Sequence, residues 1–136
     1  MGKPFDASKP DDYEGTSFDR AVLAHAIFKH GRLRAASFYQ ADLGGADLRN
    51  AELPKANLGE ANLNAADLSG ADLSGANLEQ AALEGVRLTA AVLRGATLEK
   101  ADLLGADLSG ADLTAANLVN ADHFRAHLCK IQPCRG

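Results

Sequence analysis

Leucine recurs at every fifth position from Leu43 to Leu118, sixteen times in succession. Two residues before each of these leucines the chain has alanine, with Val86 as the single exception. The stretch ADLSGADLSGANL, residues 66–78, shows the unit at its clearest. A repeat this regular indicates that one small structural unit is stacked on copies of itself, so the repeat defines the architecture.

A five-residue period fits neither a straight helix nor a straight strand. Five residues of an α-helix turn through about 500°, so successive leucines would lie about 140° apart around the axis. In a straight strand, residues separated by an odd number point to opposite faces. The leucines can share one interior only if each repeat contains a short extended piece followed by a bend.

The residue types agree with a bend at the last two positions of each repeat. Alanine and leucine, two residues apart in the extended piece, share a face, and the residue between them points outward. The second bend position is often glycine, as at Gly70 and Gly75, which predicts type II turns with positive φ. For the bends that have Lys55, Glu60 or Gln80 at this position, we expect type I turns.

A chain that bends in the same sense every five residues closes into a coil, and successive coils can pair as parallel strands about 4.8 Å apart. The run ADLSGADLSGANL and its neighbours resemble the pentapeptide-repeat family, whose motif is A-(D/N)-L-x-x. The resemblance covers most of the chain. It implies an all-β fold, a right-handed parallel quadrilateral β-helix with four repeats in each coil.

The sequence predicts three segments: a tail or cap at residues 1–15, the β-helix at 16–120, and a short C-terminal capping helix with a tail at 121–136. The helix is expected because Phe124, Leu128 and Ile131 have i, i+4, i+7 spacing after Asp122, a suitable N-cap. The repeat pattern extends upstream to Phe18, which favours a coil for residues 18–30. A helix from Ser17 to Gly31 is the alternative for this segment.

Composition restricts the function. The formal net charge is −4, which argues against a general nucleic-acid-binding protein. The chain has neither an apolar run of about 20 residues nor the apolar core of a signal peptide, so we expect no membrane association and a cytoplasmic location. A protein from which an export signal has been removed would look the same.

No group of residues has the pattern of a catalytic site, and no cofactor is expected. Ser69, Ser74 and Ser109 occupy bends without a histidine nearby in the pattern. His123 and His127 have helical i, i+4 spacing close to two cysteines, which makes a metal site conceivable, although such residues also fit the rim of a capping helix. We therefore predict no metal site and no enzymatic activity.

The two cysteines, Cys129 and Cys134, are separated by four residues, one of which is Pro133. They could close a disulfide that fixes the C-terminus. In a cytosolic protein they would more often stay reduced.

The most informative surface feature is acidic. With four repeats in each coil, six carboxylates are expected in two outward columns: Asp47, Asp67 and Asp107 in one, and Glu52, Asp72 and Asp112 in the next. Like charges about 4.8 Å apart repel by on the order of 1 kcal/mol in water, a cost that a binding function would explain. Alternatively, Asp and Asn are simply what the outer wall accepts, with Arg87 relieving the repulsion.

These features favour a non-catalytic protein-interaction module that presents rigid flat faces to an unidentified protein. The resemblance implies one alternative, because some family members, the quinolone-resistance and mycobacterial gyrase-inhibitor proteins, are acidic dimeric rods that mimic DNA and bind DNA gyrase. The six carboxylates would then be phosphate surrogates. This sequence departs from those members, since Arg87 and Arg94 interrupt the acidic columns and no dimerisation helix is evident. We expect a monomer or an end-to-end dimer.

Overall fold

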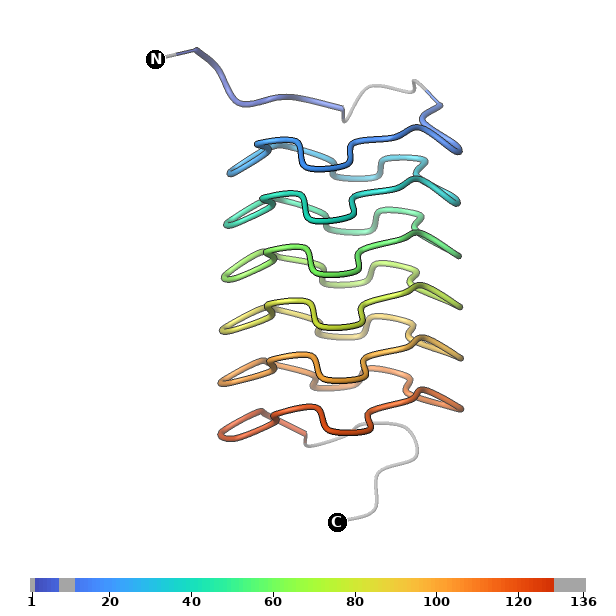
Figure 1. Cartoon of the computed structure of the whole chain (residues 1–136), viewed down its shortest axis with the longest axis vertical. Coiled ribbons are helices and arrows are strands. Elements are labelled where there is room, and N and C mark those ends of the chain that lie inside the picture. The colour runs from blue at the N-terminus through green and yellow to red at the C-terminus, as the bar shows by residue number, and fades with distance from the viewer. Residues whose placement is uncertain (1, 8–11, 129–136) are drawn as a thin grey trace.

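The chain winds into a stack of four-sided coils in the computed structural model, which describes residues 2–7 and 12–128. Parallel bridges join residues 20 positions apart from Asp12 to His127, for example Asp42 to Asn62 and Asn62 to Ala82. Twenty residues are four repeats of five, so each coil has four sides and four corners (Figure 1). The quadrilateral parallel coil expected from the repeat is therefore confirmed.

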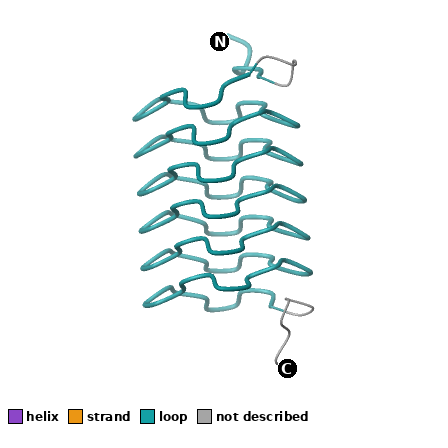
Figure 2. Ribbon diagram, turned by 90° about the vertical axis from the view of Figure 1, so that its right-hand side faces the viewer, coloured by secondary structure: helices purple, strands orange, loops and turns teal. Residues whose placement is uncertain are grey.

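Neither a helix nor a continuous strand occurs in the described residues, and Figure 2 accordingly draws all of them as loop. Each side of a coil contributes one bridged residue, and the chain turns again two residues later. The parallel ladder consists of isolated bridges because five residues leave room for only one bridge between corners. The described part of the chain contains no helix with the length and hydrophobicity needed to span a bilayer.

The bridged residues point outward and define four faces, numbered here in chain order from Val22. Face 1 contains Val22, Asp42, Asn62, Ala82, Asp102 and Asp122. Face 2 contains Ile27, Asp47, Asp67, Arg87, Asp107 and His127. Face 3 contains Asp12, Arg32, Glu52, Asp72, Val92 and Asp112. Face 4 contains Ser17, Ser37, Asn57, Asn77, Thr97 and Asn117.

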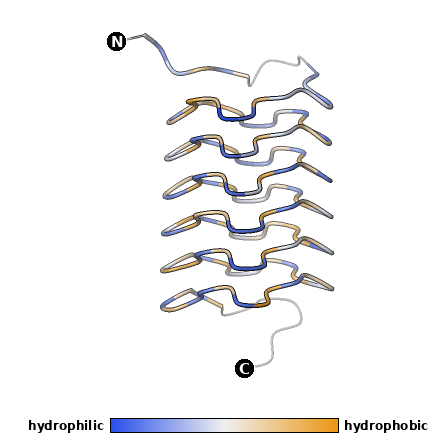
Figure 3. Cartoon of the chain, viewed as in Figure 1, coloured by the Kyte–Doolittle hydropathy of each residue, from blue (hydrophilic) through white to orange (hydrophobic). Residues whose placement is uncertain are grey.

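Alanine and leucine fill the interior, as the pattern predicted. The first and third residues of the repeats from Leu33 to Ala111 are buried, and their exposed fractions do not exceed 1%. Apolar inward and polar outward residues alternate along each coil (Figure 3). Because each inward side chain lies between equivalent side chains of the coils above and below, the core is a narrow column.

Every corner uses the same backbone conformation, whatever its sequence. The fifth residue of each repeat has positive φ from Gly15 to Arg125, including fifteen residues that are not glycine. Lys55, Glu60 and Gln80 have φ of 60°, 54° and 57°, so the type I turns expected there were wrong. Positive φ costs a non-glycine residue roughly 1–2 kcal/mol, but a corner of another shape would lose its register with the corners above and below.

The N-terminal end is coiled from the start of the repeat pattern. Bridges at Ser17, Val22 and Ile27 show that residues 18–30 form a coil, and the alternative helix from Ser17 to Gly31 is not present. Upstream, Asp6 pairs in parallel with Ile27, and Ala7 is fully buried. Residues 2–7 and 12–15 thus lie over the first coil.

At the C-terminal end, the expected capping helix is not formed by residues 121–128. Asp122 bridges to Asp102 and His127 to Asp107, with a corner at residues 124–125 between them. The i, i+4, i+7 spacing of apolar residues was misleading here, because the backbone hydrogen bonds of the preceding coil extend the five-residue pattern past the last leucine in phase. Residues 129–136, the rest of the predicted helix and tail, lie outside the described residues.

Candidate interaction surface

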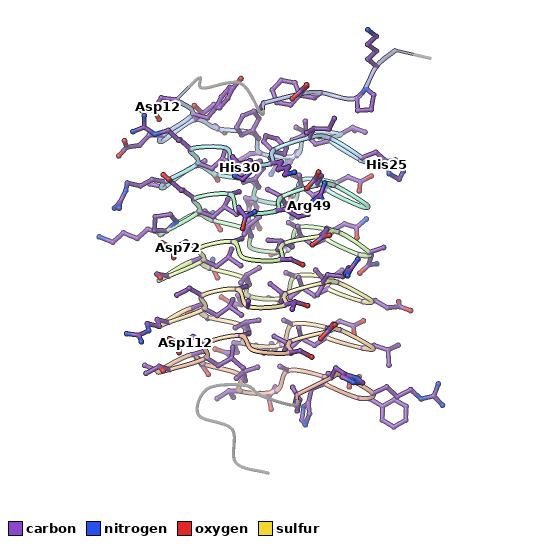
Figure 4. All side chains as sticks on the ribbon, turned by 180° about the vertical axis from the view of Figure 1, so that it is seen from behind. Asp12, His25, His30, Arg49, Asp72 and Asp112 are labelled. Carbon is purple, nitrogen blue, oxygen red and sulfur yellow. The ribbon has the colours of Figure 1, made fainter. Side chains whose placement is uncertain are left out.

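The six carboxylates singled out from the sequence lie on two adjacent faces. Asp47, Asp67 and Asp107 are on face 2, and Glu52, Asp72 and Asp112 are on face 3. Figure 4 shows Asp72 and Asp112 toward one side of the stack, with Arg49 closer to the N-terminal end. The predicted stacking is confirmed, and Arg87 and Val92 interrupt the columns at the expected positions.

The hydrogen bonds of a single repeat explain why these positions are acidic or amidic. In the repeat 41–45, the first, second, third and fifth amides donate to backbone carbonyls at 2.7–3.0 Å. The fourth amide, that of Gly44, donates instead to Asp42 Oδ1 at 3.0 Å. The side chain at the second position thus pairs the one amide that the backbone ladder leaves over.

This bond is a general feature of the stack. Every Asp and Asn at the second position of a repeat from Asp12 to Asp122 accepts from the amide two residues later. Asp and Asn have the right side-chain length to bond a backbone amide two residues further on. The bond therefore needs an oxygen at this position and does not need a negative charge.

The exceptions support this interpretation. The one repeat with Glu at the second position, Glu52, has Pro54 at the fourth, and proline has no amide hydrogen to pair. Where Ala82 provides no acceptor, the Glu84 amide donates to Asn64 Oδ1 of the preceding coil at 2.8 Å. Sequence reasoning missed this role, although the pairing of Glu52 with Pro54 was a signal for it.

The serines and threonines that follow the aspartates belong to the same bonds. The hydroxyls of Ser69 and Ser74 donate to Oδ1 of Asp67 and Asp72 at 2.6 Å, and their amides donate to the same oxygens at 3.0 Å. Ser109 donates its amide to Asp107 Oδ1 at 3.0 Å. In each carboxylate one oxygen is therefore engaged in the corner.

Arginines contact the second oxygen of several carboxylates. Arg49 donates to both oxygens of Asp47 at 2.7 and 2.8 Å, and this bond lowers the pKa of the Asp47 carboxyl. Arg94 donates to Asp112 Oδ2, and Arg87 approaches Asp67 Oδ2 at 4.0 Å. Such exposed pairs contribute about 0–1 kcal/mol each, so they reduce the local repulsion more than they stabilise the fold.

Hydrogen bonds to the ionised form also lower other acidic pKa values. The hydrogen bond from the Thr114 hydroxyl, and next in size the one from Arg94, lower the pKa of Asp112 to about 2. Ser109 lowers the pKa of Asp107, with a smaller contribution from His127 in the next coil. Asp107 and Asp112 therefore remain ionised well below neutral pH.

The remaining residues considered from the sequence do not come together. Ser69, Ser74 and Ser109 are engaged with aspartates on different corners. Among the described residues, no group of three or more His, Cys, Asp or Glu side chains could hold a metal ion. His123 and His127 lie on successive sides of the last coil, and the predicted disulfide between Cys129 and Cys134 lies outside the described residues.

The arrangement therefore consists of flat polar faces on a packed interior. No buried side-chain nitrogen or oxygen in the described part of the chain lacks a hydrogen-bond partner. The outward aspartates and asparagines are held by bonds to their own corner. Such a surface suits recognition of another macromolecule through preorganised polar groups.

A family model described as pentapeptide repeats (8 copies) matches residues 16–53, 51–89 and 91–122. This match confirms the resemblance noted in the sequence, and the family's fold is a right-handed quadrilateral β-helix. No curated protein sequence matched the chain.

Solved structures of pentapeptide repeat proteins are similar to the chain. A protein from the Arabidopsis thaliana thylakoid lumen has 32% sequence identity over 77% of this chain and 66% of its own, with a TM-score of 0.48. One from Nostoc has 35% identity over 67% and 83%, with a TM-score of 0.42. The plasmid-mediated fluoroquinolone resistance protein QnrB1 has 23% identity over 87% and 77%, with a TM-score of 0.35. The chain spans about two thirds of the length of the Arabidopsis protein.

Proposed function

Because the chain belongs to the pentapeptide repeat family, we propose that it is a rigid, non-catalytic protein-interaction module whose partner is a protein. The observation that carries this proposal is the pairing of the aspartates and asparagines of the outer wall. Every aspartate and asparagine at the second position of a repeat from Asp12 to Asp122 is fixed to its own corner. A surface already fixed in the free protein loses little side-chain entropy on binding.

Four substitutions test the faces separately without disturbing the corners. Ala82→Lys, Arg87→Glu, Glu52→Lys and Thr97→Lys change faces 1, 2, 3 and 4 at positions whose side chains do not accept the corner amide. Each variant is first shown by urea unfolding to have the same unfolding free energy as the parent. It is then used to capture partners from a cell extract by cross-linking. We expect one protein to be lost with one variant and retained with the other three. Identical capture by all four variants would contradict a face-specific module.

A DNA-mimicking gyrase-binding protein is the competing function, and the acidic columns are the observation in its favour. Two features weigh against it: Arg87 lies within one column and Arg94 pairs with Asp112 of the other, and one oxygen of each aspartate in the columns is used by the corner. We therefore expect no inhibition of gyrase supercoiling and no protection from a fluoroquinolone, even at a large excess of the protein.

The matched control for that assay is Asp67→Asn with Asp72→Asn. Asparagine keeps the oxygen that accepts the Ser69 and Ser74 amides, so the variant removes charge and leaves the corners intact. Inhibition by the parent that disappears in this variant would replace our proposal with the DNA-mimic function. Light scattering of the same samples would distinguish a monomer from an end-to-end dimer.

A further inference from the structure

Cations gather on face 3 and its two flanking corners in two neighbouring coils near the N-terminal end. We call this set the basic surface, and it consists of Lys29, His30, Arg32, Arg34, Arg49 and Lys55. Lys29 and Arg49 lie one coil apart on the corner between faces 2 and 3, where Figure 4 shows His30 and Arg49. Arg34 and Lys55 lie on the opposite corner of face 3, and Arg32 lies on the face between them.

The pairing of these cations differs from that of cations further along the stack. Arg87, Arg94 and Lys100 each lie within 4.0 Å of a carboxylate oxygen. In the basic surface, Arg49 pairs with Asp47 at 2.7 Å, and Arg32 pairs loosely with Asp12 at 3.8 Å.

Lys29, Arg34 and Lys55 form no ion pair within 4.0 Å with any residue that the structure describes. The positive charge of Lys29 makes only the smallest contribution to lowering the pKa of the Asp47 carboxyl. The side chain of Arg32 is 60% exposed despite its ion pair, and Arg34 and Lys55 are exposed. The carboxylates around them are Asp12, Glu14, Asp47 and Glu52, one fewer than the five lysines and arginines, so the surface has a small excess of positive charge.

The same faces become acidic in the following coils. Along faces 2 and 3 the basic surface is followed by Asp67, Asp72, Asp107 and Asp112. The two cations near them, Arg87 and Arg94, already form ion pairs. The basic surface therefore extends over two coils, about 10 Å along the axis at the spacing of parallel strands. This length is close to the Debye length of about 8 Å at physiological ionic strength.

We propose that the basic surface binds a short, carboxylate-rich segment of a protein partner. This inference rests on the proposed function and assigns the chemistry of the partner. Arginine and lysine pair well with carboxylates, and arginine can form two parallel hydrogen bonds with one carboxylate. The two basic corners, on either side of face 3, provide places for acidic side chains that project from a single extended segment.

The short extent of the surface favours an acidic peptide over a nucleic acid. A duplex has uniform charge, with one phosphate per roughly 1.7 Å of axis, and would continue from the basic surface onto the aspartates of the next coils. An acidic protein segment can end after a few residues and continue with neutral ones. The net charge of −4 also opposes any long polyanion.

The test measures binding of a fluorescein-labelled decapeptide of alternating Glu and Ser by fluorescence anisotropy, at low salt and then at physiological salt. Arg34→Glu with Lys55→Glu is expected to weaken binding about tenfold or more, since it reverses two unpaired cations. Arg94→Glu with Lys100→Glu is the matched control, because it changes the net charge by the same amount in coils outside the basic surface. We expect the control to bind within about twofold of the parent.

Three outcomes would overturn the inference: no binding of the peptide at low salt, an equal loss in both variants, or tighter binding of a 12-base-pair DNA duplex than of the peptide. Equal loss would mean that only overall charge matters. Unfolding curves of both variants confirm that each is folded. Failure here would leave the proposed module intact, because the face-specific capture does not depend on an acidic partner.

Discussion

The two ends of the stack are closed very differently. At the N-terminal end, Phe5 packs against Phe18 and Phe28 with ring centroids 6.0 and 5.5 Å apart, and Phe18 stacks on Phe38 at 4.9 Å. At the C-terminal end, Phe124 is 63% exposed, and Leu128 is 42% exposed. One end is covered by residues 2–7 with a cluster of rings, whereas the last described coil leaves its apolar side chains exposed.

The difference shows that the repeat specifies the middle of the stack and does not specify its ends. An inward leucine in the middle has neighbouring coils on both sides, and an inward leucine at an end has one. The N-terminal end compensates with larger inward residues and with an added segment, in which Ala7 donates to the Ile27 carbonyl at 2.6 Å. Stability should therefore be greatest in the middle and unequal at the two ends.

The largest expected effect compares the middle with the C-terminal end. Leu73→Ala removes a fully buried side chain from the centre of a column that has little room to collapse, and we expect it to lose about 2–5 kcal/mol of unfolding free energy. Leu118→Ala makes the same change where the residue is 36% exposed, and we expect less than half that loss. Urea unfolding measures both, and equal losses would show that the ends are as well packed as the middle.

A smaller effect compares the two ends directly. Phe5→Ala removes ring contacts to three aromatic side chains from a residue that is 41% exposed, and we expect a loss of about 1–2 kcal/mol. Phe124→Ala should cost under about 0.5 kcal/mol, because the ring is mostly exposed and its cation–π contact with Arg125 lies at the surface. A larger loss for Phe124→Ala in thermal unfolding would reverse the proposed order of the two ends.

The third comparison concerns the hydrogen bond from the fourth amide of a repeat to the side chain at the second position, with an expected loss of unfolding free energy of about 1 kcal/mol. Asn62→Ala removes the acceptor of the Asn64 amide in a partly buried corner, and we expect a loss of about 0.5–1.5 kcal/mol. Asp122→Ala removes the same kind of bond in the exposed last coil and should cost less. Glu52→Ala should be nearly neutral, because Pro54 offers no amide. A loss for Glu52→Ala equal to that for Asn62→Ala in urea unfolding would refute the role assigned to this position.

The smallest effect concerns acid. The pKa of Asp112 falls from 3.8 to about 2 in the folded protein, so the unfolded chain binds more protons between these values. Its contribution to stability is present above about pH 4 and is lost as the pH falls toward 2. Hydrogen exchange at residues 101–120 should therefore accelerate between pH 4 and 2 more in the parent than in Asp112→Asn, after correction for intrinsic rates. The same acceleration in both proteins would contradict this assignment.

The fold was largely predictable because its interactions are periodic. Leucine and alanine at fixed positions determined which side chains point inward, and Leu73 lies in the core as expected. The corners at Lys55 and Glu60 were not predictable from residue preferences, since stacking imposes positive φ on them. The end at residues 121–128 was mispredicted for a related reason, because the hydrogen bonds of the preceding coil outweigh a local helical pattern.

The candidate surface was predictable only in part. The positions of the six carboxylates followed once a coil of four repeats was assumed, but their bonds to the corner amides did not. The basic surface was not identified, although Lys29, His30, Arg32 and Arg34 are close together in the sequence. Arg49 and Lys55 join them only through the alignment of one coil with the next.

By itself, the sequence determined that the chain bends every five residues and that leucine and alanine occupy the interior, because hydrophobic burial and turn formation are local consequences of the repeat. The tertiary structure decided which residues stack on one another, which conformation every corner shares, and how each end is closed. These features depend on hydrogen bonds between residues about 20 positions apart, for example from Leu43 to Asn62. Such bonds form only when one coil lies on the next.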